Sequence, residues 1–328
     1  MSSIARKKLP YTRSEAKAWG RKTMHGFIEV FPTPFTPTGN INWDAHRRNM
    51  EKLLGIKTDG FLTGGNIAEG WNMTPAEWFK FQEIVADVMA EKTPHLSSVI
   101  LDPSPFTAVE KLNRLADLGF NAVEVITPIF QLRSDEQIYE YFKILSTETD
   151  IAILIYNTPA AGRVLSHDLI DRIADLETVV GIKHGLASLP NSVRLRKRVG
   201  DRIVVCEPLP RHWAIDVAQY GGQVLYGGPE YILLGKKREL LRQIADLAGK
   251  GKITEALRLE REIEPAISLY EDYILWSIVE RGVYDMSGIK YWYGLVGYES
   301  SPMRRPANDL AEQDKAHIEE VIRSCGII

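Results

Sequence analysis

The chain has 328 residues, of which 45% are hydrophobic and 25% charged, with a formal net charge of −3 at pH 7. This composition is typical of a folded globular protein. It excludes a mostly disordered chain, and the slight acidic excess argues against a nucleic-acid-binding protein. The two cysteines are widely spaced, the stretch at 1–22 is polar and basic, and no apolar run approaches the roughly 20 residues of a membrane span. These features predict a cytoplasmic protein without a signal peptide.

From residue 26 onward, short β-rich runs alternate with amphipathic helical stretches. Strands are predicted at 27–31, 60–63, 95–101, 122–127, 151–156, 179–183, 203–206 and 224–227. Helices are predicted at 44–54, from 75, at 107–118, from 135, and at 166–174, 192–198 and 213–218. Two helix starts carry a capping box, Thr74 with Glu77 and Ser134 with Gln137. Each pair can satisfy backbone amides at both ends of the first turn.

This alternation predicts a parallel sheet, and about eight strand–helix units favour a (β/α)₈ TIM barrel. No GxGxxG motif follows the first strand, which argues against a doubly wound dinucleotide-binding sheet. The remaining chain has helical patterns at 253–273 and 311–325. We therefore expect an N-terminal extension at 1–25, a catalytic barrel at 26–250 and a C-terminal helical region at 251–328. The extension is expected to be solvated or to pack on a neighbouring subunit.

Barrel active sites lie at the C-terminal ends of strands, so the residues where strands end are candidates for the site. Lys183 ends an apolar strand, where burial disfavours the ammonium form, and a neutral amine can form a Schiff base with a keto group. Tyr156 ends the neighbouring strand and can move protons. On position alone, a lysine that reaches solvent and a tyrosine that only packs remain open alternatives. His184 is expected to point away from the site, since strand residues alternate between faces.

Three other strand ends offer polar or flexible groups. The turn with Asn66 presents donors that can hold a carboxylate, or it is simply a tight turn. Glu207 ends the seventh strand and is either an acid–base group or a solvated turn residue, and Gly228 follows the eighth strand. No metal is expected, because the seven histidines form no local pair at metal-ligand spacing.

Together these motifs resemble the dihydrodipicolinate synthase / N-acetylneuraminate lyase superfamily of class I aldolases, from about residue 26 to the C-terminus. Residues 156–159 (YNTP) resemble the YNxP motif with its catalytic tyrosine, and residues 181–183 (GIK) the GxK motif with the Schiff-base lysine. Residues 65–69 (GNIAE) resemble a variant of the GTTGE carboxylate-binding turn. The resemblance implies a covalent Schiff base on Lys183, proton transfer by Tyr156, no separate cofactor, and a homotetramer built as a dimer of dimers.

The chain departs from the synthase branch at several positions. The two hydroxyls of the turn become Asn66 and Ile67, and the stretch with Phe130 lacks the tyrosine that completes a proton relay. The arginine expected soon after YNxP is out of register, at Arg163. An apolar entrance with Ile67, Ile129 and Phe130 instead resembles hydratase-aldolases that cleave arylidene-pyruvates, where Glu207 can assist hydration.

We therefore expect a class I lyase that forms or cleaves a C–C bond in a 2-keto acid, with pyruvate as product or donor. Its partners would be a 2-keto acid and an aldehyde, not nucleic acid or a membrane. A Schiff-base 2-keto acid dehydratase and a non-catalytic ligand-binding relative remain alternatives. The expected catalytic residues are Lys183 and Tyr156, and the expected substrate-binding residues are Gly65, Asn66, Ile67, Phe130, Glu207 and Gly228.

Overall fold

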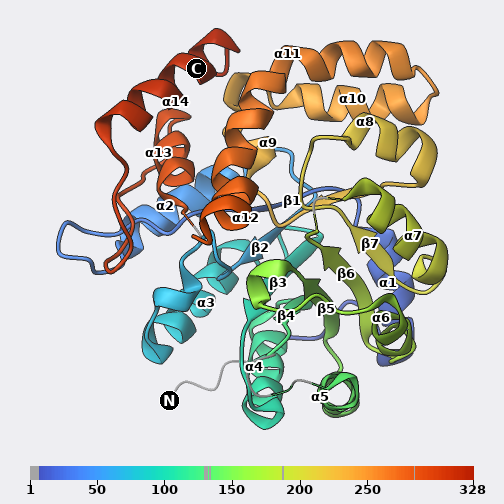
Figure 1. Ribbon diagram of the computed structural model, residues 1–328. Coiled ribbons are helices and arrows are strands. Elements are labelled where there is room, and N and C mark those ends of the chain that lie inside the picture. Colours follow the sequence, from blue (N-terminus) through green and yellow to red (C-terminus); the bar gives the residue numbers. More distant parts are fainter. Residues whose placement is uncertain (1–6, 129–131, 133, 187, 284) are drawn as a thin grey trace.

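The computed structural model describes residues 7–128, 132, 134–186, 188–283 and 285–328. Within them, eight parallel strands surrounded by helices form a (β/α)₈ barrel, as predicted (Figure 1). The strands are β1 Gly26–Val30, β2 Gly60–Thr63, β3 His95–Ile100, β4 Ala122–Ile126, β5 Ala152–Asn157, β6 Val179–His184, β7 Val204–Cys206 and β8 Val224–Tyr226. They pair in the order β7-β6-β5-β4-β3-β2-β1-β8, and a bridge between Glu207 and Leu225 joins the two ends of the sheet.

Helices cover the outside of the barrel, and several of them begin at a capping residue. They are α2 Trp43–Leu53, α3 Pro75–Met89, α4 Pro105–Leu118, α5 Asp135–Glu148, α6 His167–Ala174, α7 Leu189–Val199, α8 Trp213–Ile215 with a π-helical turn at Asp216–Tyr220, α9 Glu230–Leu233 and α10 Glu239–Gly249. Both predicted capping boxes are present, at the starts of α3 and α5. No helix in the described part of the chain is long and apolar enough to span a membrane.

The C-terminal region is helical and returns to the barrel. It comprises α11 Ile253–Glu271, a π-helical turn at Asp272–Trp276, α12 Ser277–Arg281, α13 Ser287–Leu295 and α14 Glu312–Ser324. Figure 1 shows α11 alongside α10, with α13 and α14 on the side of the barrel near α2. The segments before and after α13 contribute residues to the cavity described below, so this region forms part of the site.

Within the described residues, the N-terminal segment packs on this chain's own barrel from Tyr11 onward, so the expectation of a solvated arm is wrong for this part. The buried Tyr11 hydroxyl donates to the backbone oxygen of Asn121 and accepts from the amide of Ala152, both at 2.6 Å. These two residues lie at the beginnings of β4 and β5, and Trp19 stacks on His95 at the beginning of β3. The segment therefore covers the N-terminal end of the barrel, opposite the ends where barrel active sites lie.

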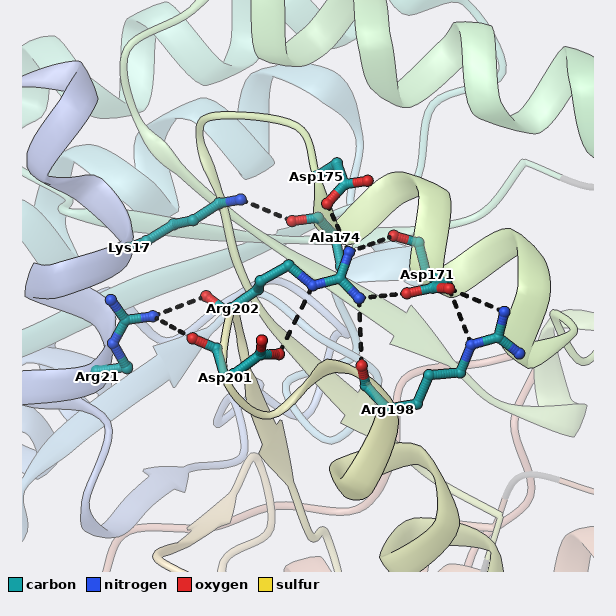
Figure 2. Close-up of polar contacts among 8 residues, drawn as sticks. All are labelled: Lys17, Arg21, Asp171, Ala174, Asp175, Arg198, Asp201 and Arg202. Atoms are coloured by element: carbon teal, nitrogen blue, oxygen red, sulfur yellow. Dashed lines mark hydrogen bonds and ion pairs between the residues drawn. The ribbon is translucent and has the colours of Figure 1, made fainter.

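Polar contacts fix helix α1 (Ala16–Thr23) to the loops beside it (Figure 2). The Lys17 amine donates to the carbonyl of Ala174 at 2.6 Å, and Arg21 donates to the carbonyls of Asp201 and Arg202 at 3.1 and 3.0 Å. These donors bond backbone atoms, so the contacts hold the helix against the ends of α6 and the loop before β7. A basic N-terminal stretch therefore has a structural role within its own chain.

Candidate active site

Lys183 and Tyr156 lie side by side at the C-terminal ends of β6 and β5, where they pair directly in the sheet. Lys183 is 7% exposed, and its Nζ donates to the carbonyl of Gly227 at 3.0 Å. The same Nζ lies 4.7 Å from the centre of the Tyr156 ring. A buried primary amine thus faces a phenol inside the barrel mouth, which is the arrangement that Schiff-base chemistry needs.

His184 faces the other side of the sheet, as expected from its position next to Lys183. Its Nε2 bonds the Asn191 side-chain oxygen at 3.0 Å, and its Nδ1 lies 3.3 Å from the Asn157 amide nitrogen. Burial lowers the pKa of His184 to about 4, so the ring is neutral at pH 7. A neutral tautomer with a proton on Nε2 satisfies both contacts, so His184 has a positioning role beneath the YNTP turn.

A small cavity around the amine brings together five of the predicted residues, which come from three strands or the turns after them. They are Gly65, Asn66, Ile67, Tyr156 and Lys183. The cavity is about 20 Å³, room for about one water molecule. The N–H groups of Asn66 and Ile67 have no hydrogen-bond acceptor among the described residues. The turn can therefore offer these two amides, and the Asn66 side chain, to a carboxylate.

The turn is held in place by a buried ion pair with the C-terminal region. Glu69, the last residue of the GNIAE motif, has a left-handed backbone with φ 55°, and its carboxylate lies 2.5 Å from the amine of Lys290. Both side chains are almost fully buried, and Lys290 also donates to the carbonyl of Thr33 at 2.9 Å. The other Glu69 oxygen accepts from the amide of Arg304 at 3.0 Å. A helix far along the chain thus sets the geometry of the turn.

Two predicted site residues lie elsewhere, and one lies outside the described residues. Glu207 lines a separate cavity of about 210 Å³, together with Trp213, and does not line the small cavity around Lys183. The reason is strand alternation, because Cys206 pairs with Lys183 and points inward, which turns the next residue outward. Burial raises the pKa of Glu207 to about 7. Phe130 lies outside the described residues.

The glycine beside the amine is Gly227, one residue before the predicted Gly228. A Cβ added to Gly227 would lie 2.6 Å from Nζ of Lys183, whereas one added to Gly228 would meet the carboxylate of Glu230 and the hydroxyl of Tyr270. Only a glycine leaves room for the amine at position 227, because φ there is +74° and no side chain fits. The predicted residue and the glycine beside the amine therefore belong to the same turn, and Gly227 is the one that contacts Lys183.

One acid inside the barrel was not predicted from the sequence. Glu124, the third residue of β4, is 1% exposed and lines the small cavity around Lys183. Burial raises its pKa to about 7, and the charge of Lys183 partly opposes this shift. The signal was available, because Glu124 interrupts an otherwise apolar strand and shares the inward face of Ile126.

A buried pair of acidic residues flanks the eighth strand. Glu29 and Glu230 are both almost fully buried, and the Glu230 carboxylate accepts from the Tyr270 hydroxyl at 3.2 Å. Burial and the neighbouring Glu230 raise the pKa of Glu29 well above its usual range, and burial raises that of Glu230 to about 7. At least one of the two carboxyls is therefore protonated near neutral pH.

A larger cavity of about 850 Å³ lies above the amine and shares Asn66, Ile126 and Tyr156 with the small one. Its apolar lining includes Trp71, Leu101, Pro103, Val283, Met303 and Pro306. Six described lining residues have polar side chains, of which one is a carboxylate, Asp285, and none is a lysine or arginine. Across the described chain, no group of three His, Cys, Asp or Glu side chains could hold a metal ion.

Comparison with known proteins gives one consistent result. The family model for the dihydrodipicolinate synthetase family matches residues 23–325. A 4-hydroxy-tetrahydrodipicolinate synthase of Lactococcus lactis subsp. cremoris is 29% identical over 245 residues, which are 74% of this chain and 80% of that protein. A putative dihydrodipicolinate synthetase from Pseudomonas aeruginosa has the same fold, with a TM-score of 0.80 at 20% identity over 92% of this chain and 99% of that one. So does CdNal from Clostridium difficile, solved with mannosamine, with a TM-score of 0.76 at 24% identity over 92% and 98%.

Proposed function

This chain belongs to the dihydrodipicolinate synthetase family, and we propose that it forms or cleaves a C–C bond between pyruvate and an apolar, aromatic-tolerant aldehyde. The family relation makes it a class I pyruvate-type lyase or aldolase, whose Schiff base on a lysine takes the place of an external cofactor. The observation that carries the proposal is the 850 Å³ cavity, which leads to Asn66 and Tyr156 through a mainly apolar lining.

The proposed reaction starts when Nζ of Lys183 attacks the keto carbon of the substrate, and the keto oxygen leaves as water to give an iminium. The amides and side chain at Asn66 hold the carboxylate. Tyr156 takes the proton of the 4-hydroxyl as the C3–C4 bond breaks, and the electron pair moves into the iminium to give an enamine. The aldehyde leaves, a proton adds to C3, and hydrolysis releases pyruvate and the free amine. With an unsaturated keto acid, water adds at C4 before this sequence.

The lining of the larger cavity favours an apolar aldehyde over an anionic one or a sugar. An aldehyde with a second carboxylate would need a cationic partner, and the described lining offers no lysine or arginine. Arg163, the arginine that follows YNTP, forms an ion pair with Asp135. A sugar would need several hydrogen-bonding partners, and this lining is mostly apolar.

The proposal is tested by turnover with pyruvate and three aldehydes: benzaldehyde, a carboxylated aliphatic aldehyde and an N-acylated amino sugar. We expect kcat/KM to be at least tenfold higher for benzaldehyde than for the other two. Leu101→Arg, which places a cation at the edge of the cavity, should shift the preference towards the carboxylated aldehyde. Phe106→Arg is the matched control, because Phe106 is 73% exposed and does not line this cavity. A wild-type preference for the anionic aldehyde or the sugar would overturn the proposal.

The same residues would also serve a Schiff-base 2-keto acid dehydratase, in which the iminium acidifies the C3 proton and water leaves from C4. Product identification separates the two reactions, because only C–C cleavage yields pyruvate and an aldehyde. A relative that binds keto acids without turnover would give a reducible adduct or binding and no product. The retained pair of Lys183 and Tyr156 favours turnover.

We also propose that the protein acts in the cytoplasm as a homotetramer, as the family resemblance implies. Light scattering after size-exclusion chromatography tests the assembly, with an expected mass four times that of the 37.0 kDa chain. A monomeric mass would overturn this part of the proposal without affecting the chemistry.

A further inference from the structure

Glu124 occupies the layer of the barrel interior directly below Tyr156 and Lys183. In the sheet, Ile126 pairs with Tyr156, which pairs with Lys183, and Glu124 precedes Ile126 by two residues. Alternate strand residues share a face, so Glu124 points inward, about 7 Å further down the barrel axis. It lines the same small cavity as the amine.

The surroundings of Glu124 compensate only part of the cost of its burial. The side chain is 1% exposed, and its Oε2 has no hydrogen-bond partner within the part of the chain that the structure describes. Glu124 interacts electrostatically with three titratable groups, which are Lys183 from β6, Cys206 from β7 and Tyr226 from β8. Of these, only Lys183 can carry a positive charge.

Burial of a carboxyl group at this position destabilises the fold. Barrel interiors are filled mainly by branched apolar side chains, and an apolar residue of similar volume would avoid the desolvation cost. The hydroxyl of the neighbouring Tyr226 is engaged elsewhere, because it lies 2.9 Å from the Ser97 hydroxyl. Stability therefore does not account for the acid, and its place beside the reactive amine suggests that it takes part in the chemistry.

We propose that Glu124 is the acid–base partner of Lys183 and carries the proton needed to form and hydrolyse the Schiff base. This inference rests on the proposed function, because it concerns the same amine. Nζ attacks the keto carbon, the C–N bond forms, and the carbonyl π pair moves to oxygen. The carboxyl proton of Glu124 passes to that oxygen, and the proton lost by nitrogen returns to the carboxylate.

Dehydration follows with the same group. The nitrogen lone pair forms the C=N bond, the C–O bond breaks, and the departing hydroxide takes the Glu124 proton and leaves as water. The barrel then holds an iminium and a carboxylate, so the pair remains neutral overall in surroundings that penalise an isolated charge. Hydrolysis runs through the same steps in reverse.

The test compares Glu124→Gln with Glu207→Gln, a matched control. Burial raises the pKa of both acids to about 7, and they lie in different cavities. Rapid-quench borohydride reduction measures the rate of pyruvate adduct formation across pH 5–9. We expect Glu124→Gln to slow the adduct about 10²- to 10³-fold and to remove an ionisation near pH 7 from the profile, with Glu207→Gln within twofold of wild type.

Glu124→Met provides a second variant in case the glutamine disturbs the barrel. It should be at least as stable as wild type, because the burial cost disappears, and as slow as Glu124→Gln. Adduct formation at the wild-type rate in both variants would overturn the inference and leave the Schiff-base chemistry intact. Equal slowing by Glu207→Gln would also overturn it. No adduct in the wild type with any 2-keto acid would overturn both the inference and the proposed function.

Discussion

Gly227→Ala should displace the amine of Lys183 and lower the free energy of unfolding. Residue 227 has φ +74°, a conformation that costs a non-glycine residue about 1–2 kcal/mol. The added methyl group would lie 2.6 Å from Nζ of Lys183 and 2.8 Å from Cδ2 of Leu62, and such overpacking costs about 1–3 kcal/mol. The free energy of unfolding should therefore fall by about 2–5 kcal/mol. Displacement of the amine by about 1 Å should slow adduct formation about 100-fold.

Gly251→Ala separates the two contributions. Residue 251 has the same φ of +74°, and a methyl group there would meet nothing within 4 Å in the described structure. It should lose only the conformational part, about 1–2 kcal/mol, and keep the wild-type rate of adduct formation. Urea titration gives the stabilities, and borohydride reduction after timed mixing with pyruvate gives the rates. Equal losses of stability in the two variants, with equal rates, would refute the reasoning.

Three further predictions concern buried polar groups. Lys290→Met should lower the free energy of unfolding, measured by urea titration, by about 3–5 kcal/mol, because it leaves Glu69 without its cation. A further Glu69→Gln change should restore part of this loss. An unchanged free energy of unfolding in Lys290→Met would contradict a stabilising ion pair. Tyr11→Phe should cost about 1–3 kcal/mol, because the buried amide of Ala152 loses its acceptor, and an unchanged melting temperature would contradict that role for the N-terminal segment. The folded protein keeps the Glu207 proton up to about pH 7, whereas the unfolded chain releases it near pH 4.5, so stability falls as pH rises across this window. Glu207→Gln should remove up to about 3 kcal/mol of that decline, and an unchanged pH dependence would argue against a buried acid.

Much of the fold was predictable because its signals are local. The strands are short apolar runs bounded by glycine, proline or polar residues, and their predicted limits agree with the structure to within one or two residues. The capping boxes of α3 and α5 gave correct starts for the same reason. Helices α4 and α7 begin earlier than predicted, at Pro105 and Leu189, after the caps Ser104 and Ser188. Each has a proline in its first two positions, a start signal that periodicity alone does not use.

The site was predictable where its residues come from one motif each. Lys183, Tyr156 and the turn at 65–69 end their strands, and the barrel brings strand ends together. Glu207 lies in the outer cavity rather than beside Lys183, because one residue at a strand end decides between the barrel interior and the outer face, and the sequence does not reveal which face that residue takes. Glu124 was not predicted because barrel active-site residues are expected at strand ends, and this acid lies in mid-strand.

Other parts depend on tertiary packing that no local pattern specifies. Val283 and Met303 line the larger cavity only because the C-terminal region returns across the barrel mouth. The ion pair between Glu69 and Lys290 joins residues 221 positions apart. The position of Trp19 beneath the barrel likewise follows from contacts with β3 rather than from the composition of the N-terminal segment.

Borohydride reduction in the presence of pyruvate tests the central claim most directly, with the modified peptide identified by mass spectrometry. We expect one reduced pyruvate adduct on the peptide that contains Lys183, and none in Lys183→Ala. No adduct with pyruvate or with a panel of longer 2-keto acids would contradict the account. An adduct of equal yield in Lys183→Ala would contradict the assignment of the amine.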